Sequence, residues 1–278
     1  MWEKRSNWML IFVMLTAGMV FVQFAMFLGQ FLFHIRMPMN LFNLCIEYLR
    51  FIGMPVRMNL MIFLVGSTLM ISLGAVIREI AASLRWRKLE LRLGDEERKR
   101  LLCTEHGLSP MDLTVIDHNE PVAMTIGVLR PRIVLSTGLI STLSSVELRA
   151  VIAHEKFHLM KKHPLAMLLL SLLALTFWYI PIYKWVMDKY KVLIELMADR
   201  HAVQTTGSAA GLGGALLVLI KRGQGTPSAL GNVSFAGTAL NLRLKQLMDP
   251  QFKPAFRPPV VASCISVVIF TFVVFGLF

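Results

Sequence analysis

Cysteine and acidic residues are both scarce in this chain of 278 residues. The three cysteines, Cys45, Cys103 and Cys264, lie far apart and in no disulfide or metal-ligand spacing, so we expect small packing residues in a reducing compartment. Charged residues make up only 17% of the chain, which is too few for an ordinary soluble domain. Internal repeats and low-complexity segments are also lacking.

Apolar residues take the place of the missing charge. Hydrophobic residues make up 55% of the chain, and the mean hydropathy is +0.61. Trp8–Phe33, Met58–Ile77 and Pro259–Phe278 are long and apolar enough to cross a bilayer. The first run is too long for the core of a cleaved signal peptide. Leu165–Met187 is nearly as apolar, whereas Ser208–Ile220 is too short to span and predicts a buried helix.

The distribution of basic residues predicts the topology. The formal net charge is +12, and basic side chains cluster in residues 78–100, whereas the 34–57 loop has three arginines. The positive-inside rule therefore predicts a multi-pass protein with the N-terminus inside. We expect two transmembrane helices over 1–81, a cytoplasmic domain over 82–257 and a transmembrane helix over 258–278. These charges fit anionic lipid rather than nucleic acid as a partner.

The first part of the cytoplasmic region alternates short strands and helices. A mixed-charge helical pattern precedes the strands, and a second helix follows them. That second helix has Ser144 as its N-cap and Glu147 three residues later, which is a capping box. It should run through His158 and stop near His163, because proline follows. The expected elements before it are a helix over Leu84–Leu102 and strands over Leu113–Asp117, Val122–Leu129 and Arg132–Ser136.

A metal-hydrolase pattern lies in the middle of this capped helix. His154 and His158 are one helical turn apart, so both imidazoles leave the same face and can bind one zinc ion. Glu155 follows the first histidine, where it can take a proton from zinc-bound water. The alternative is a polar stripe on a core helix, with both histidines hydrogen-bonded to backbone carbonyls.

A catalytic zinc site needs a third protein ligand. Glu195 is our candidate, in a helical segment over Lys189–Val203, with Asp199 one turn later on the same face. Such an acidic pair repels itself unless something cationic binds it. We therefore expect Glu195 to bind zinc and Asp199 to accept the free N–H of a zinc-bound histidine. The alternative is an ordinary surface ion pair between Lys191 and Glu195.

Three further residues have weaker signals. His201 or Tyr190 could donate to the oxyanion of a tetrahedral intermediate, although nothing in the spacing fixes their direction. His163 ends a helix in a Lys-Lys-His-Pro sequence, where we expect a solvated side chain that complements the helix dipole.

The apolar segment between the two halves of the motif raises a problem of topology. If 165–187 crossed the membrane once, Glu195 and the two histidines would face opposite compartments. Pro181 divides the segment, and aromatic residues on both sides of it suit a membrane–water interface. We therefore predict a bent or re-entrant helical pair that returns to the cytoplasmic side.

These motifs resemble those of the gluzincin membrane metallopeptidases. The closest likeness is to the antirepressor type, which includes the beta-lactam sensor-transducers of Gram-positive bacteria. It covers residues 121–204 and, more weakly, 242–250. The segments that carry the resemblance are Leu129–Ser136, Glu147–Glu155 with His158, the aromatic–proline break, and Glu195-Leu-Met-Ala-Asp199.

The resemblance implies an α+β integral membrane protein with a zincin-like (gluzincin) cytoplasmic domain in a bacterial cytoplasmic membrane. It makes Glu155 the catalytic base and Asp199 the support of a ligand. It also implies that an extended substrate chain pairs with an edge strand. The implied zinc ligands are His154, His158 and Glu195, and the implied edge strand is Ile133, Val134, Leu135 and Ser136.

The chain also departs from the sensor-transducers. They carry an external penicillin-binding domain after the last span, whereas this chain ends at Phe278 and has no external Ser-x-x-Lys motif, so we do not expect a beta-lactam receptor. The leading hypothesis is a zinc endopeptidase that cleaves a cytoplasmic or juxtamembrane protein, such as a winged-helix repressor or itself. The alternatives are a quality-control or processing peptidase of the heat-shock type and a non-catalytic transducer with a structural zinc site.

Overall fold

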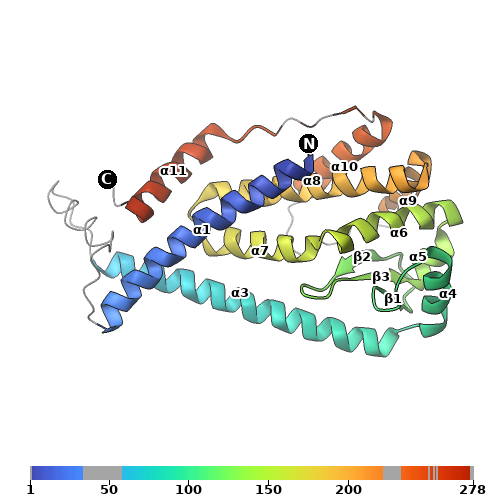
Figure 1. Ribbon diagram of the computed structural model, residues 1–278, viewed down its shortest axis with the longest axis horizontal. Helices are drawn as coiled ribbons and strands as arrows, with labels where there is room; N and C mark the ends of the chain where they lie inside the picture. The colour runs from blue at the N-terminus through green and yellow to red at the C-terminus, as the bar shows by residue number, and fades with distance from the viewer. Residues whose placement is uncertain are drawn as a thin grey trace.

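Helices make up most of the protein, and a three-stranded sheet lies at one end of it (Figure 1). The structure is a computed structural model that describes residues 2–33, 58–221, 233–249, 251, 252, 254 and 256–275. The helices are α1 (Trp2–Phe33), α3 (Met58–Leu93), α4 (Glu96–His106), α5 (Thr137–Thr142), α6 (Ser145–Met160), α7 (His163–Thr176), α8 (Pro181–Thr206), α9 (Ala209–Lys221), α10 (Val233–Met248) and α11 (Val260–Phe275), and the strands are β1 (Leu113–Ile116), β2 (Ala123–Ile126) and β3 (Arg132–Ser136).

Two of the described helices are long and apolar enough to cross a membrane. They are α1, with the window Ser6–Met26, and α3, with the window Val65–Trp86. Many of their large apolar side chains are exposed, as lipid-facing residues of a membrane protein would be. The α11 helix has 16 residues in the described part of the chain, which is short for a span. The third predicted span therefore stays a prediction.

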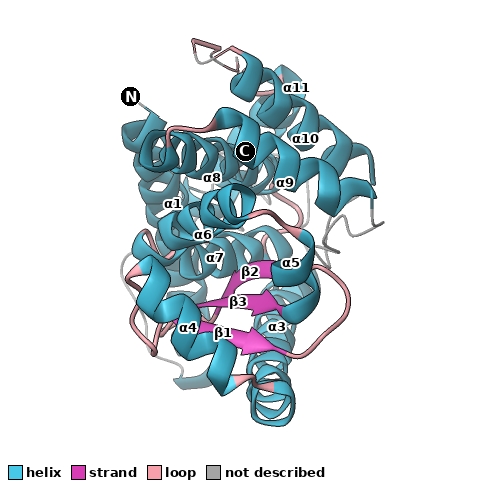
Figure 2. Ribbon diagram, turned by 90° about the vertical axis from the view of Figure 1, so that its right-hand side faces the viewer, coloured by secondary structure: helices cyan, strands magenta, loops and turns pink. Residues whose placement is uncertain are grey.

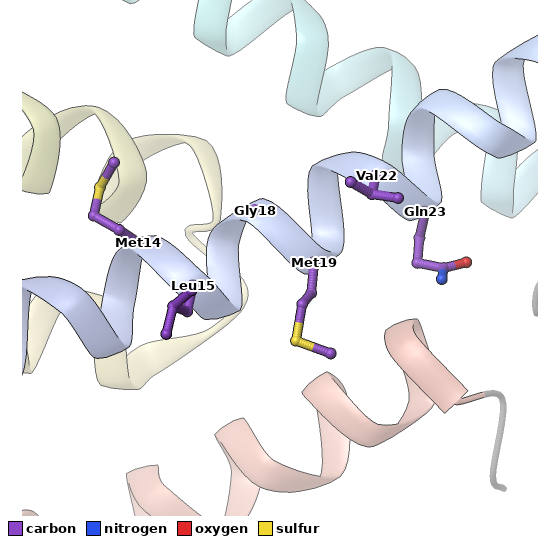
Figure 3. Close-up of a pocket in the computed structure, with 6 residues that line it drawn as sticks. All are labelled: Met14, Leu15, Gly18, Met19, Val22 and Gln23. Carbon is purple, nitrogen blue, oxygen red and sulfur yellow. The ribbon is translucent and has the colours of Figure 1, made fainter.

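A shallow hollow of about 420 Å³ runs along α1 where that helix faces α11. Figure 3 shows Met19 and Gln23 pointing from α1 toward α11. Gly18 lies between neighbouring turns of this lining and adds no side chain to it. The lining has no titratable group, so this hollow offers no acid–base chemistry.

The sheet has the order β1–β3–β2, with β3 in the middle. β1 pairs with β3 in parallel, and β2 pairs with β3 antiparallel. Both backbone edges of β3 are therefore occupied, and the prediction that Ile133, Val134, Leu135 and Ser136 form the substrate-binding edge is wrong. The outer edge of β1 is bridged at Ile116 by Gly94, and among the described strands the outer edge of β2 has no strand partner.

The α6 helix packs across the sheet and is fixed at its start by the predicted capping box. The Ser144 hydroxyl accepts from the Glu147 backbone N–H, and the Glu147 carboxylate accepts from the Ser144 backbone N–H at 2.9 Å. Leu148 and Ile152 pack in one apolar core with Ile133 of β3. Figure 2 shows the strands beneath α6. The helix that carries His154 and His158 is therefore held in place by its packing against the sheet.

The chain leaves the sheet domain along α7 and returns along α8. Lys162, with a φ of 51°, lies at the break between α6 and α7, and the two helices meet at an angle of 61°. Pro181 is the first residue of α8, in agreement with the predicted break. From there α8 runs unbroken for 26 residues, antiparallel to α7 (Figure 1). This return brings Glu195 beside α6.

The boundaries of the other predicted elements differ in two places. The helix predicted over 84–102 is broken at Gly94, which bridges to Ile116 of β1, and Asp95 then caps α4. The second strand is shorter than predicted. The short apolar run after Ser208 forms the buried helix α9, where Gly214 touches α6: a Cβ on Gly214 would lie 2.3 Å from the Glu147 Oε1 atom.

Candidate metal centre

Two helices bring three potential metal ligands together. His154 and His158 come from α6, and Glu195 comes from α8. The two imidazole Nε2 atoms lie 3.1 Å apart. The Glu195 carboxylate oxygens lie 3.5 Å from the His154 Nε2 atom and 3.6 Å from the His158 Nε2 atom. Glu195 lies 37 or more positions from both histidines in sequence, so the return of α8 completes the group.

The donor atoms fit a zinc ion by type and by spacing. Tetrahedral zinc with bonds of 2.0–2.1 Å holds its ligand atoms about 3.3 Å apart. The two Nε2 atoms lie close to that separation, and each of the two Glu195 oxygens lies close to it from one of the histidines. Two imidazoles and a carboxylate are also ligand types that zinc prefers. The Glu195 side chain is 32% exposed, whereas the two histidine side chains are about 10% exposed or less. The group is therefore open on the carboxylate side, as a catalytic site requires.

Asp199 lies against the first histidine. Its Oδ1 atom is 2.9 Å from the His154 Nδ1 atom, and its side chain is fully buried. This contact occupies the nitrogen of His154 that faces away from the three-donor group. A carboxylate in this position fixes the tautomer and the ring orientation of a metal-binding histidine.

Arg243 of α10 is the cation that the acidic pair requires. Its Nε and Nη2 atoms each donate to Asp199 at 2.7 Å, and its Nη1 atom lies 3.0 Å from the Glu195 Oε2 atom. From the sequence we expected zinc as the cation for this pair, and Arg243 was not predicted. Arg243 lies 44 residues from Asp199, inside the 242–250 stretch of the family resemblance. That stretch was the one available signal.

The charges at the centre shift one another's pKa. Burial alone would raise the pKa of Glu195, but Arg243 and the two imidazoles outweigh it, so that pKa is well below its ordinary value. Burial opposes ionisation of Asp199 as well, yet Arg243 and His154 lower its pKa. Burial would lower the pKa of Arg243, and the two carboxylates raise it. Both carboxylates are therefore ionised, as metal binding requires.

Glu155 lies next to the donor group and contacts the sheet. The Thr125 hydroxyl of β2 donates to a Glu155 carboxylate oxygen at 2.7 Å and lies 3.1 Å from the Glu155 backbone carbonyl. The Glu155 side chain is buried. Thr125 therefore links the edge strand to the residue that follows the first histidine. Thr125 was not predicted from the sequence, because a contact between strand and helix depends on how the two pack.

Comparison with known proteins shows the family of the chain. The sequence profile of the BlaR1 peptidase M56 family matches residues 51–247, which is more than half of the chain. The chain belongs to this family. Family membership implies a metallopeptidase, which in turn implies a metal cofactor, and the two candidate membrane helices support a membrane protein. The matched range contains the three donors and Asp199, Glu155 and Arg243.

One curated relative illustrates how much of the chain is shared. The regulatory protein BlaR1 of Bacillus licheniformis is 28% identical over 152 residues, which is 54% of this chain and 25% of the relative. The aligned part thus spans a quarter of the length of that relative.

A second histidine contact in this M56 chain contradicts a prediction. His163 was expected to be solvated, but it is 5% exposed, and its Nδ1 atom lies 2.8 Å from the Nδ1 atom of His158. The expectation was wrong because α7 begins at His163 with a bend that turns the ring inward. His163 therefore occupies the outward nitrogen of His158, as Asp199 does for His154.

Neither predicted oxyanion donor, His201 or Tyr190, contacts the donor group in the described part of this M56 chain. The His201 ring faces Phe157 at 5.0 Å, and Tyr190 is 4% exposed within an apolar core. The alternative readings also fail. Glu195 pairs with histidines and Arg243 rather than with Lys191, and the histidine nitrogens face side chains rather than backbone carbonyls.

Proposed function

We propose that the protein is a zinc metalloendopeptidase of the gluzincin type that works at the face of a membrane. The observation that carries the proposal is the group of three donor atoms within 4.8 Å of one another, with Glu155 adjacent in sequence to one donor. A structural zinc site more usually has four protein ligands, and here three donors meet in a group that is open on one side.

Each residue has a role that follows from its position. His154, His158 and Glu195 hold the metal, Asp199 orients His154, and Arg243 holds the two carboxylates. A bound zinc ion supplies a Lewis acid and acidifies water. Glu155 takes the proton of the attacking water and delivers it to the leaving amine. The Thr125 hydroxyl orients the Glu155 carboxylate for this transfer.

We assign the binding of the scissile chain to the open edge of β2. An extended peptide can add to a sheet edge through main-chain hydrogen bonds. β2 is the open edge next to α6, and Thr125 on it already contacts Glu155. A peptide on this edge would run directly past the donor group.

We infer a protein substrate and a regulatory role on the cytoplasmic side of a bacterial membrane. The basic residues of 78–100 support this orientation by the positive-inside rule. The relative from Bacillus licheniformis is named a regulatory protein, which favours signalling over general quality control. A winged-helix repressor and the chain itself are the substrates to test first.

The decisive comparison is wild type against Glu155→Gln and His154→Ala, each purified in detergent and loaded with zinc. We expect Glu155→Gln to bind zinc like wild type, by elemental analysis, and to cleave fluorescent β-casein about 10²- to 10⁴-fold more slowly. His154→Ala should lose both zinc and cleavage. Undiminished cleavage by Glu155→Gln would reject the assignment of the base and, with it, this mechanism.

A further inference from the structure

A large cleft opens beside the candidate active site, between α3, α7 and the β2–β3 hairpin. Its volume is about 1090 Å³. Val76, Ile80 and Ser83 line one wall from α3, and Leu168 of α7 lines the other. The positions on α3 repeat at helical spacing, so one face of that helix forms the wall. Figure 1 shows the hairpin beside α3 and α7.

The cleft meets the sheet at the hairpin end of β2. Thr125 and Ile126 line it together with the turn Gly127–Arg130 and with Arg132 of β3. One backbone edge of β2 pairs with β3, and the other has no strand partner among the described strands. Thr125 also donates to the Glu155 carboxylate at 2.7 Å, so the cleft borders the residue that follows the first histidine.

One wall of the cleft has the sequence features of a membrane–water interface. Its α3 wall is the last part of the candidate span Val65–Trp86, where the charged residues Arg78 and Glu79 begin. Trp86 also lines the cleft, and tryptophan prefers the interface. At the hairpin, Leu129 is 85% exposed and is followed by Arg130. An exposed apolar side chain beside a cation suits the lipid headgroup region.

From these features we propose that the substrate is a membrane-anchored protein whose extended juxtamembrane segment enters between α3 and β2. This inference rests on the proposed peptidase function and narrows its substrates to membrane-anchored proteins, which include the chain itself and exclude a soluble winged-helix repressor. The occupant is an extended polypeptide because the cleft reaches the unpartnered edge of β2 at Thr125 and Ile126. It is membrane-anchored because the opposite wall belongs to the candidate span Val65–Trp86, and a shared membrane raises its effective concentration at the cleft.

A pair of neighbouring substitutions tests the route. Ser83 and Leu84 are both exposed on α3, but only Ser83 lines the cleft. The full chain is reconstituted in vesicles with β-casein fused behind one transmembrane helix, or with soluble β-casein. We expect wild type to cleave the anchored casein at least tenfold faster than the soluble one. Ser83→Trp should lower cleavage of anchored casein at least tenfold, and Leu84→Trp should leave it unchanged.

The second wall gives an independent variant. Leu168→Trp should reproduce the loss, and elemental analysis should find wild-type zinc in all three variants. Equal cleavage of anchored casein by Ser83→Trp and Leu84→Trp would overturn the proposed route. Equal rates for anchored and soluble casein would overturn the substrate class.

A binding measurement separates this inference from catalysis. In zinc-loaded Glu155→Gln, photoreactive benzoylphenylalanine at position 83 should crosslink to anchored casein, and at position 84 it should not. Crosslinking at 83 without any cleavage by wild type would support the cleft and refute the peptidase function. Cleavage by wild type without crosslinking at 83 would refute the cleft and leave the peptidase function standing.

Discussion

Two histidines at the centre each have a partner on their outward nitrogen. Asp199 occupies that of His154, and His163 occupies that of His158. The sequence predicted an aspartate partner, because Asp199 follows Glu195 by one turn of the same helix. It did not predict His163, because a side chain at a helix break has no fixed direction. The sequence can thus identify residues on one helical face but not those that a bend turns inward.

We predict that His163 tunes the metal affinity of His158. When the Nε2 atom of His158 binds metal, its Nδ1–H donates to the Nδ1 atom of His163. His163→Ala should therefore weaken zinc binding about 10- to 100-fold, measured by competition with a chelator. His201→Ala, on a histidine outside the group, is the matched control and should bind zinc like wild type. Equal affinities for both variants would remove His163 from the centre.

We also predict that Arg243 stabilises the metal-free protein. Arg243→Ala leaves the fully buried Asp199 without its guanidinium, and breaking such a buried pair costs about 3–5 kcal/mol. The thermal midpoint of the zinc-free variant should fall well below that of the zinc-free wild type. Arg243→Lys keeps the charge but not the two-pronged contact, so its midpoint should lie between them. Arg200→Ala, on an exposed residue of α8, should have little effect, and an equal fall there would contradict the assignment.

The helix starts that a short sequence motif marks were predicted best. The capping box at Ser144 and Glu147 fixed the start of α6, and Pro181 fixed the start of α8. The order of the strands has no such local signal. Ile133, Val134 and Leu135 form a continuous buried run, which suits a central strand, but the partners of a strand are chosen by tertiary packing.

The contact between α9 and α6 can be tested with two adjacent glycines. A Cβ on Gly214 would displace the Glu147 carboxylate from its cap, whereas a Cβ on Gly213 meets nothing within 4 Å. Gly213→Ala should stabilise the protein by about 0.5–1 kcal/mol through helix propensity. Gly214→Ala should gain the same amount from helix propensity but lose about 1 kcal/mol of stability with the Glu147 cap. Its thermal midpoint should therefore lie below that of Gly213→Ala, and the reverse order would contradict the cap contact.

At the scale of the whole molecule, the centre joins segments that are distant in sequence. α6, α8 and α10 each contribute a charged or metal-binding side chain. Hydropathy predicted the helices α1 and α3, because a long apolar run identifies a span by itself. The packing of α10 on α8 could not be predicted, because no local pattern links Arg243 to Asp199.

Removal of metal should therefore loosen the whole domain. Zinc at 100 times its dissociation constant stabilises the folded state by about 2.7 kcal/mol. We expect a chelator to lower the thermal midpoint of the wild type by several degrees, measured by intrinsic fluorescence in detergent. His154→Ala should melt at the same temperature with and without the chelator. An equal shift in this variant would point to a metal bound elsewhere.

The unbroken course of α8 has a mechanical consequence. Pro181 begins the helix among the apolar contacts with α1 and α7, and Glu195 lies 14 residues further along, about 21 Å at 1.5 Å per residue. A continuous helix of this length moves as one body, so a displacement of one end also displaces the other end. A displacement of the Pro181 end of α8 would therefore change the distances between the Glu195 carboxylate and the two imidazoles.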